Sequence, residues 1–119
     1  MKLVFVLVST ILMTITIVLP AKSKSLTGDE IKQVFVSNQL IIKGIPSYYI
    51  NGKMCWREAQ GNIMVRKWEV RGNAYISNVV CTGKGCALSK FGNRITFRKL
   101  DTGGTRTFTL KKGHKRGCF

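Results

Sequence analysis

Short runs of alternating apolar and polar residues dominate the chain after residue 40, with turn residues between them at roughly 8 to 12 residue spacing. In the run 94–100, Ile95 and Phe97 alternate with Thr96 and Arg98, which predicts a strand with one buried and one exposed face. Repetition of this pattern predicts a mainly β fold. We expect a small antiparallel barrel or curled meander of seven to eight short strands.

The turn residues set the limits of the expected strands. The strands are predicted at residues 40–45, 48–50, 53–58, 63–70, 74–81, 86–90, 94–100 and 105–111. The clearest hairpin joins the second and third of these through Asn51-Gly52, because Asn-Gly favours the two positive φ angles of a type I′ turn.

One short helix is expected in front of the strands. Residues 27–30, Thr-Gly-Asp-Glu, have the spacing of a capping box, with the threonine as N-cap and the glutamate reaching back from N3. Ile31, Val34 and Phe35 follow on one side of the helix, and Asn38 is a suitable stop. A helix this short depends on packing for its stability, so we expect its apolar side to lie on the sheet.

The N-terminal segment has the features of a secretion signal. Lys2 is followed by uncharged residues from 3 to 19 and then by Pro20, and Ala21-Lys22-Ser23 predicts cleavage after Ser23, with Ser25 as a second choice. Residues 1–23 are therefore expected to be a signal peptide of a periplasmic or secreted protein. The alternative is a retained inner-membrane anchor, because 3–19 falls just short of the roughly 20 apolar residues that span a bilayer.

Residues 24–119 are expected to form a single domain, for which 96 residues suffice. An exported protein of this size is commonly stabilised by disulfides, and Cys55, Cys81, Cys86 and Cys118 are the candidates. Cys81 and Cys86 can pair locally if the glycines between them turn tightly, which leaves Cys55 for Cys118, but three pairings stay open. Without C-x-x-C pairs or more than one histidine, we expect no metal site and no cofactor.

The charge is strongly positive. The chain has 20 Lys and Arg residues against five acids, a formal charge of +15, and loss of residues 1–23 would leave +13. The C-terminal half holds the candidate anion-binding residues, Arg94, Arg98, Lys99, Arg106, Lys111, Lys112, Lys115 and Arg116. The expected partner is an anionic surface or polyanion, such as lipid head groups, lipopolysaccharide, an acidic glycan or an acidic protein. Nucleic acid is less favoured for an exported protein, and charge that serves solubility alone stays open.

Aromatic residues lie among the basic ones, as in a platform on which the bases of single-stranded nucleic acid stack. Aromatics on alternating strands more often belong to the core, and we expect this for Trp68 and two of the tyrosines. Trp56, between Cys55 and Arg57, is the best candidate for an exposed contact residue.

No catalytic arrangement emerges from the sequence. Asp29 and Glu30 are the only adjacent acids, and helix capping already accounts for them. The single histidine, His114, lies in a lysine-rich run without a carboxylate to orient it. We therefore expect a non-enzymatic exported protein that binds an anionic partner. The alternative is a secreted effector or inhibitor that docks on a specific protein.

Several motifs also resemble a group of small exported proteins of Gram-negative bacteria. These are Leu-Thr-Gly-Asp-Glu-Ile at 26–31, the Tyr-Tyr-Ile-Asn-Gly hairpin at 48–52, Lys-Trp-Glu-Val at 67–70, Cys86, and the Phe-Gly-Asn turn at 91–93 before Arg-Ile-Thr-Phe. Members of that group begin L-[ST]-G-x-E-I and carry a G-x-W-x-V strand. The resemblance implies a periplasmic or secreted β domain, a small barrel or curled sheet behind one helix, and no catalytic element.

Overall fold

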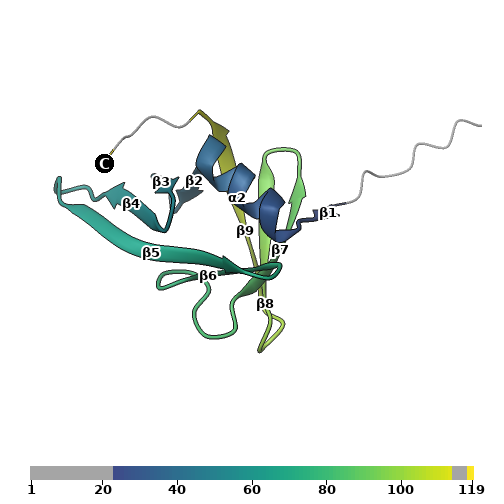
Figure 1. Cartoon of the computed structure of the whole chain (residues 1–119). Helices are drawn as coiled ribbons and strands as arrows, with labels where there is room; N and C mark the ends of the chain where they lie inside the picture. The colour runs from purple at the N-terminus through teal and green to yellow at the C-terminus, as the bar shows by residue number, and fades with distance from the viewer. Residues whose placement is uncertain (1–22, 114–117) are drawn as a thin grey trace, which may run out of the picture.

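The computed structural model describes residues 23–113 and 118–119, so most of the expected signal peptide lies outside the described part. Within that part the chain forms one helix and nine strands (Figure 1). In chain order these are β1 (Lys24–Ser25), α2 (Gly28–Ser37), β2 (Asn38–Ile42), β3 (Ile45–Ile50), β4 (Lys53–Arg57), β5 (Ile63–Arg71), β6 (Ala74–Ser77), β7 (Cys86–Phe91), β8 (Arg94–Lys99) and β9 (Thr105–Lys112).

Eight of the strands close into an antiparallel barrel. Their order is β7-β6-β5-β4-β3-β2-β9-β8, and β8 pairs back onto β7. The short β1 lies outside the ring and pairs with the end of β7, where Lys24 is opposite Lys90. The prediction of a mainly β fold, a small antiparallel barrel with one N-terminal helix, is confirmed.

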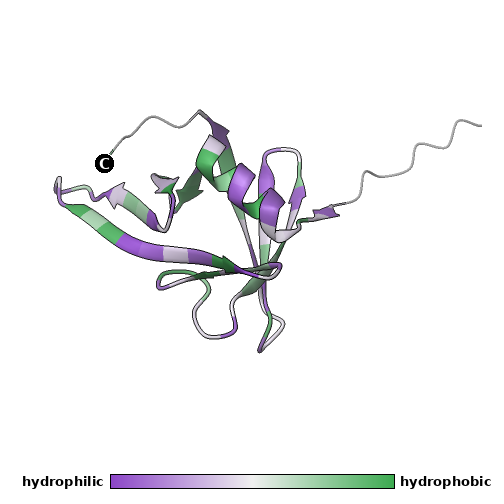
Figure 2. Cartoon of the chain, in the orientation of Figure 1, coloured by the Kyte–Doolittle hydropathy of each residue, from purple (hydrophilic) through white to green (hydrophobic). Residues whose placement is uncertain are grey.

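Helix α2 begins and ends where the sequence predicts. The hydroxyl of Thr27 accepts a hydrogen bond from the Glu30 backbone N–H, and the Glu30 carboxylate accepts one from the Thr27 N–H, which completes the capping box. Ile31 and Phe35 are fully buried, and the helix packs on β2, β3, β5 and β6. Figure 2 shows apolar positions along the helix among hydrophilic ones, in keeping with this one-sided burial.

An aromatic cluster fills the space between the helix and the barrel wall. The Phe35 ring lies 4.7 Å from that of Tyr49 and 5.0 Å from that of Tyr75, measured between centroids. Trp68, only 6% exposed, packs edge-on against Tyr49. The hydroxyls of Tyr49 and Tyr75 are 2.9 Å apart. Burial raises the pKa of Tyr75 to about 12 and that of Tyr49 well above its usual value, since a buried phenolate is poorly solvated. The core prediction is confirmed for Trp68, Tyr49 and Tyr75, whereas Tyr48 is only half-buried.

The Asn51-Gly52 hairpin is present, but the predicted type I′ turn is wrong. Gly52 has φ of 78°, whereas Lys43 is the only non-glycine residue with positive φ in the described part, so Asn51 does not adopt the left-handed conformation. Two consecutive positive φ angles occur instead at Lys43 and Gly44, 51° and 81°, in the turn between β2 and β3. The expected strand 40–45 is therefore divided: β2 ends at Ile42 and Ile45 begins β3.

The expected strand 74–81 is too long. The chain leaves the sheet at Ser77, whose hydroxyl accepts hydrogen bonds from the N–H groups of Val79 and Val80, each at 3.2 Å. The Ser77 N–H donates to the carbonyl of Cys81 and closes the turn. Residues 78–85 consequently form a loop, although their apolar residues suggested a strand.

Candidate anion-binding surface

Both pairs of cysteines form disulfides. Cys55 of β4 pairs with Cys118, and Cys81 pairs with Cys86 across the loop between β6 and β7. This is the arrangement that local closure of the 81–86 loop would produce, and it leaves no free cysteine. Disulfides persist in oxidising compartments, which indicates a location outside the cytoplasm. In residues 23–113 and 118–119, no helix has the length and apolar character needed to cross a membrane.

Three of the candidate basic residues share one face of the barrel. Ile95 and Phe97 of β8 point into the core, so Arg94 and Arg98, at the alternate positions, lie on the outer face. Leu110 of β9 is buried in the same way, which places Lys111 outside. Arg94, Arg98 and Lys111 are all exposed. We call this the β8–β9 outer face.

Hydroxyl groups cover the β8–β9 outer face between these cations. Thr96 and Thr107 lie opposite each other in the ladder, and their hydroxyl oxygens are 2.9 Å apart. Thr109 is opposite Arg94, and Thr105 is opposite Arg98. The result is a hydrogen-bonding surface with a guanidinium group towards each end of β8, separated along the strand by roughly 13 Å.

The other candidates lie elsewhere. Lys99, Arg106 and Lys112 occupy the alternate positions of β8 and β9, in line with the inward-facing residues but at the exposed strand ends. The Arg106 guanidinium lies 5.8 Å from the centre of the Phe108 ring, a cation–π contact. Lys115 and Arg116 lie outside the described residues, as does His114. The structure thus brings three of the eight candidates together.

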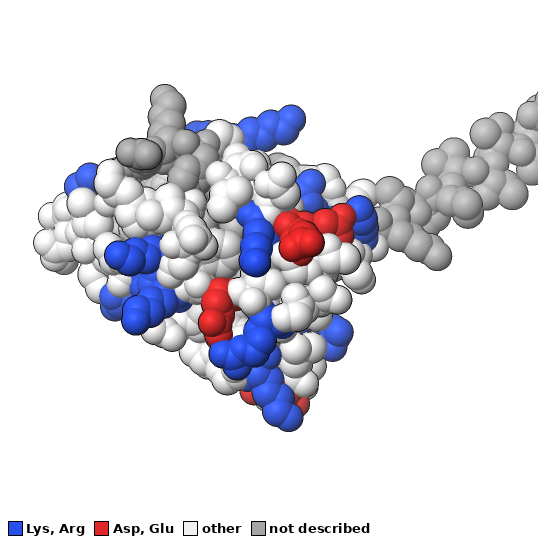
Figure 3. All heavy atoms as spheres, viewed as in Figure 1, with Lys and Arg blue, Asp and Glu red and all other residues white. Residues whose placement is uncertain are grey.

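Most of the positive charge is not paired. The described residues include sixteen Lys and Arg against all five acids. Two ion pairs form among them: Lys24 with Glu30, at 2.6 Å, and Arg71 with Glu69. Figure 3 shows basic side chains in several groups on the visible face, with acidic side chains between some of them. The described part of the chain therefore carries a large excess of positive charge, which attracts anions at long range.

Trp56 is half-buried. Its ring packs against the core cluster, and the Arg66 guanidinium lies 5.7 Å from the ring centre. Its inward direction follows from the register, because Trp56 lies opposite the buried Ser47. The surface that Trp56 offers to a partner is correspondingly small.

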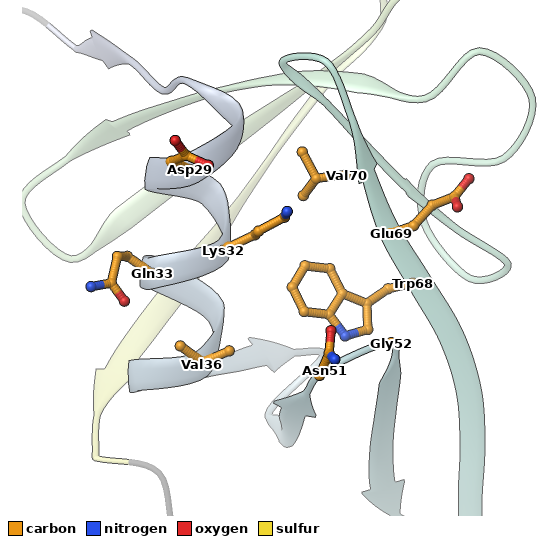
Figure 4. A pocket seen from close by; sticks show the side chains of 9 residues that line it. All are labelled: Asp29, Lys32, Gln33, Val36, Asn51, Gly52, Trp68, Glu69 and Val70. Atoms are coloured by element: carbon orange, nitrogen blue, oxygen red, sulfur yellow. The ribbon is translucent and has the colours of Figure 1, made fainter.

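A hollow that the sequence did not indicate lies between α2 and β5 and measures about 460 Å³. Its lining consists of Asp29, Lys32, Gln33, Val36, Asn51, Gly52, Trp68, Glu69 and Val70 (Figure 4). The carboxyl groups of Asp29 and Glu69 lie on opposite sides of it and do not form an acid pair. The indole N–H of Trp68 already donates to the carbonyls of Ile50 and Lys53, at 2.7 and 3.0 Å.

The hollow therefore offers a ligand the Lys32 amine, the amide side chains of Gln33 and Asn51, two separated carboxylates and apolar contacts. Among the residues that the structure describes, no three His, Cys, Asp or Glu side chains lie close enough together to hold a metal ion. No family model, no curated protein and no solved structure matches the chain.

Proposed function

We propose that this chain is a non-enzymatic exported protein, periplasmic or secreted, that binds an anionic surface or polyanion through the β8–β9 outer face. The observation that carries the proposal is the shared exposure of Arg94, Arg98 and Lys111 on one hydroxyl-covered face. Guanidinium groups bind phosphate and carboxylate groups through paired N–H donors, and threonine hydroxyls add neutral hydrogen bonds. The two disulfides support the exported location.

The spacing of the cations favours a ligand with repeated charges. Two guanidinium groups roughly 13 Å apart on one strand are too distant to hold a single small anion together. A lipid surface, lipopolysaccharide or an acidic glycan presents several anions to both of them. The unpaired cations on other elements then add long-range attraction, which salt weakens.

The test compares a variant of the proposed face with a variant of equal charge elsewhere. Arg94→Gln/Arg98→Gln/Lys111→Gln removes three positive charges from the β8–β9 outer face. The control Lys32→Gln/Lys53→Gln/Arg57→Gln removes three exposed charges from α2 and β4, and β4 is four strands from β8 in either direction around the barrel.

Binding of both variants is measured against anionic vesicles, lipopolysaccharide, heparin and single-stranded DNA over a range of salt concentrations. We expect the first variant to lose about tenfold or more in affinity and to show a shallower salt dependence, by about one unit of slope for each contact removed. The control should retain the slope. Equal losses in both variants would show that net charge alone attracts the ligand, and salt-independent binding to every probe would refute the proposal.

A further inference from the structure

Strand β5 has an edge that no other described strand covers. β4 pairs with it from Ile63 to Lys67, and β6 pairs with its other side only from Trp68 to Arg71. On the side away from β4, residues 63–67 therefore have no strand partner in the part of the chain that the structure describes. Figure 1 shows this half of β5 extending beyond β6.

The direction of the backbone groups on this edge follows from the ladder. The Trp68 N–H donates to the carbonyl of Gly52, and the carbonyl of Asn62 accepts from the Glu58 N–H, so even-numbered residues of this segment direct their backbone groups towards β4. In an antiparallel strand the alternate residues point the other way. Ile63 and Val65 consequently present N–H and C=O groups to the open side.

A cation lies on the same edge. The Arg66 guanidinium donates a hydrogen bond of 2.9 Å to the Val65 carbonyl, a group that a neighbouring strand would otherwise bind. One contact to a carbonyl and one to the Trp56 ring leave further N–H donors of the guanidinium available. In the part of the chain that the structure describes, the open edge therefore combines backbone N–H and C=O groups that have no strand partner with a positive charge.

The outer surface beside the edge is apolar with a basic rim. Ile63 and Val65 are 44% and 45% exposed, high values for residues in a barrel strand. Lys67 follows them on the same face of β5, and Lys53 and Arg57 lie opposite on β4. Exposed apolar side chains rimmed by charges are typical of a surface that binds another protein.

We propose that the 63–67 edge of β5 binds an extended segment of a partner protein, in which acidic residues alternate with apolar ones, as an added strand. Strand addition satisfies the open N–H and C=O groups, and alternate side chains reach Val65 on one face of the strand. The carboxylates, on the opposite face of the added strand, would meet Arg66, whereas Lys67 and Lys53 on the Val65 face add long-range attraction. A second copy of this chain fits the edge poorly, because self-pairing would bring the same cations together.

This site is distinct from the β8–β9 outer face, since β5 is four strands from β9 in the barrel order. The two proposals can therefore fail separately. Binding at the β8–β9 outer face requires exposed cations and places no demand on the backbone of the ligand. Binding at the β5 edge requires free backbone groups on β5 and a partner segment in an extended conformation.

Hydrogen exchange provides the direct test, on the protein recovered after expression of the full-length chain. We expect the Val65 amide to exchange rapidly, whereas those of Met64 and Arg66, which point towards β4, are protected. The probe is a blocked ten-residue peptide of alternating Glu and Val, and its control has the same composition with all Glu residues before all Val residues. The alternating peptide should slow exchange at Val65 tenfold or more.

Two variants separate backbone pairing from charge. Val65→Pro removes an N–H that makes no bond to β4, so the barrel ladder is retained while the edge is blocked. Lys53→Glu/Lys67→Glu reverses two charges that lie opposite each other on β4 and β5. One like-charged pair replaces another, so the free energy of unfolding should change little. Each variant should bind the alternating peptide at least tenfold more weakly. Arg94→Gln/Arg98→Gln should bind it as the parent does.

Several results would overturn the inference. A Val65 amide that is protected in the free protein at low concentration would show that the edge is already covered, and protection that grows with protein concentration would assign the edge to a second copy. Equal binding of both peptides, or undiminished binding by Val65→Pro, would show that charge alone attracts the probe. If Val65→Pro does not fold, the exchange data and the charge-reversal variant still decide.

Discussion

Gly28 is the residue at which a normally stabilising substitution should be harmful. It is the first residue of α2, and its N–H donates to the side-chain oxygen of Asn73 at 2.8 Å. A Cβ added at Gly28 would lie 2.1 Å from the carbonyl oxygen of Gly72 and 3.1 Å from a methyl carbon of Val70. The N-terminus of the helix thus rests directly on the turn between β5 and β6.

The magnitude follows from two opposing terms. Replacing glycine by alanine in a helix gains up to about 1 kcal/mol, through helix propensity and the smaller entropy of the unfolded chain. A contact of 2.1 Å with a backbone oxygen requires the helix end or the turn to move by about 1 Å. Overpacking of this kind costs about 1–3 kcal/mol, and loss of the Asn73 hydrogen bond costs about 1 kcal/mol more.

We therefore expect Gly28→Ala to lower the free energy of unfolding by about 2 kcal/mol, which corresponds to roughly 10 °C in melting temperature for a domain of this size. Urea and thermal unfolding followed by circular dichroism measure it. The control is Gly104→Ala, where φ is not positive and the added Cβ meets an ordinary contact of 3.5 Å. A Gly28→Ala protein as stable as the parent would refute the reasoning, because it would show that helix and turn separate at no cost.

Three further predictions concern charge and burial. Lys67→Glu replaces the like-charged cross-strand pair with Lys53 by an attractive one and should stabilise the protein by about 0.5 kcal/mol in urea unfolding at low salt, an effect that high salt removes. The pKa of Glu30 is lowered from 4.5 to about 2, mainly by the hydrogen bond from Lys24. The ionised Glu30 carboxylate therefore stabilises the fold fully above pH 4.5, and this contribution is lost as the pH falls towards 2. Glu30→Gln should flatten acid unfolding in that range. Burial keeps Tyr75 neutral up to a pKa of about 12, so its contribution is complete below pH 10 and lost between 10 and 12, and Tyr75→Phe should flatten the alkaline limb of an unfolding titration.

Features that depend on neighbouring residues were predictable from the sequence. The capping box at 27–30 satisfies the first N–H groups of α2 with side chains in the same turn, and the stop at Asn38 is equally local. The alternation of Ile95 and Phe97 with polar residues defined the buried face of β8. Each of these follows from chemistry within a few residues and needs no knowledge of the partner strands.

A turn was not predictable where a residue other than glycine or asparagine adopts a positive φ angle. Lys43 takes a positive φ that favours glycine or asparagine, so the hairpin between β2 and β3 carried no strong signal. Pro46, which lacks an N–H, directly follows the expected strand 40–45 and lies within β3. In the structure the pairing of β3 with β4 stops at Ser47 and Trp56, so Pro46 lies beyond that ladder and no bond is lost.

The sequence identified the basic residues of the candidate site, but only the pairing of β8 with β9 shows which of them share a face. The basic residues of β8 and β9 looked equivalent along the chain, but strand pairing places Arg94, Arg98 and Lys111 on one face and Arg106 at a position in line with Phe108. The open edge of β5 could not be predicted from residues 63–67 themselves. It arises because β6 ends at Ser77 and pairs only with residues 68–71 of β5.

The residue that ends β6 is Ser77, and its substitution tests this explanation. Its side chain is 2% exposed and its hydroxyl accepts hydrogen bonds from the N–H groups of Val79 and Val80, so it satisfies two backbone donors and directs the chain out of the sheet towards Cys81. Ser77→Ala leaves both donors without this partner, and we expect a loss of about 2 kcal/mol in the free energy of unfolding, measured with urea. The control is Ser25→Ala at an exposed position, which should change the free energy of unfolding by less than about 0.5 kcal/mol.

If Ser77 holds the loop away from β5, Ser77→Ala should also slow hydrogen exchange at Val65, because the freed segment gains access to the open edge. A stable Ser77→Ala protein with unchanged exchange would mean that the Cys81–Cys86 disulfide alone sets where β6 ends.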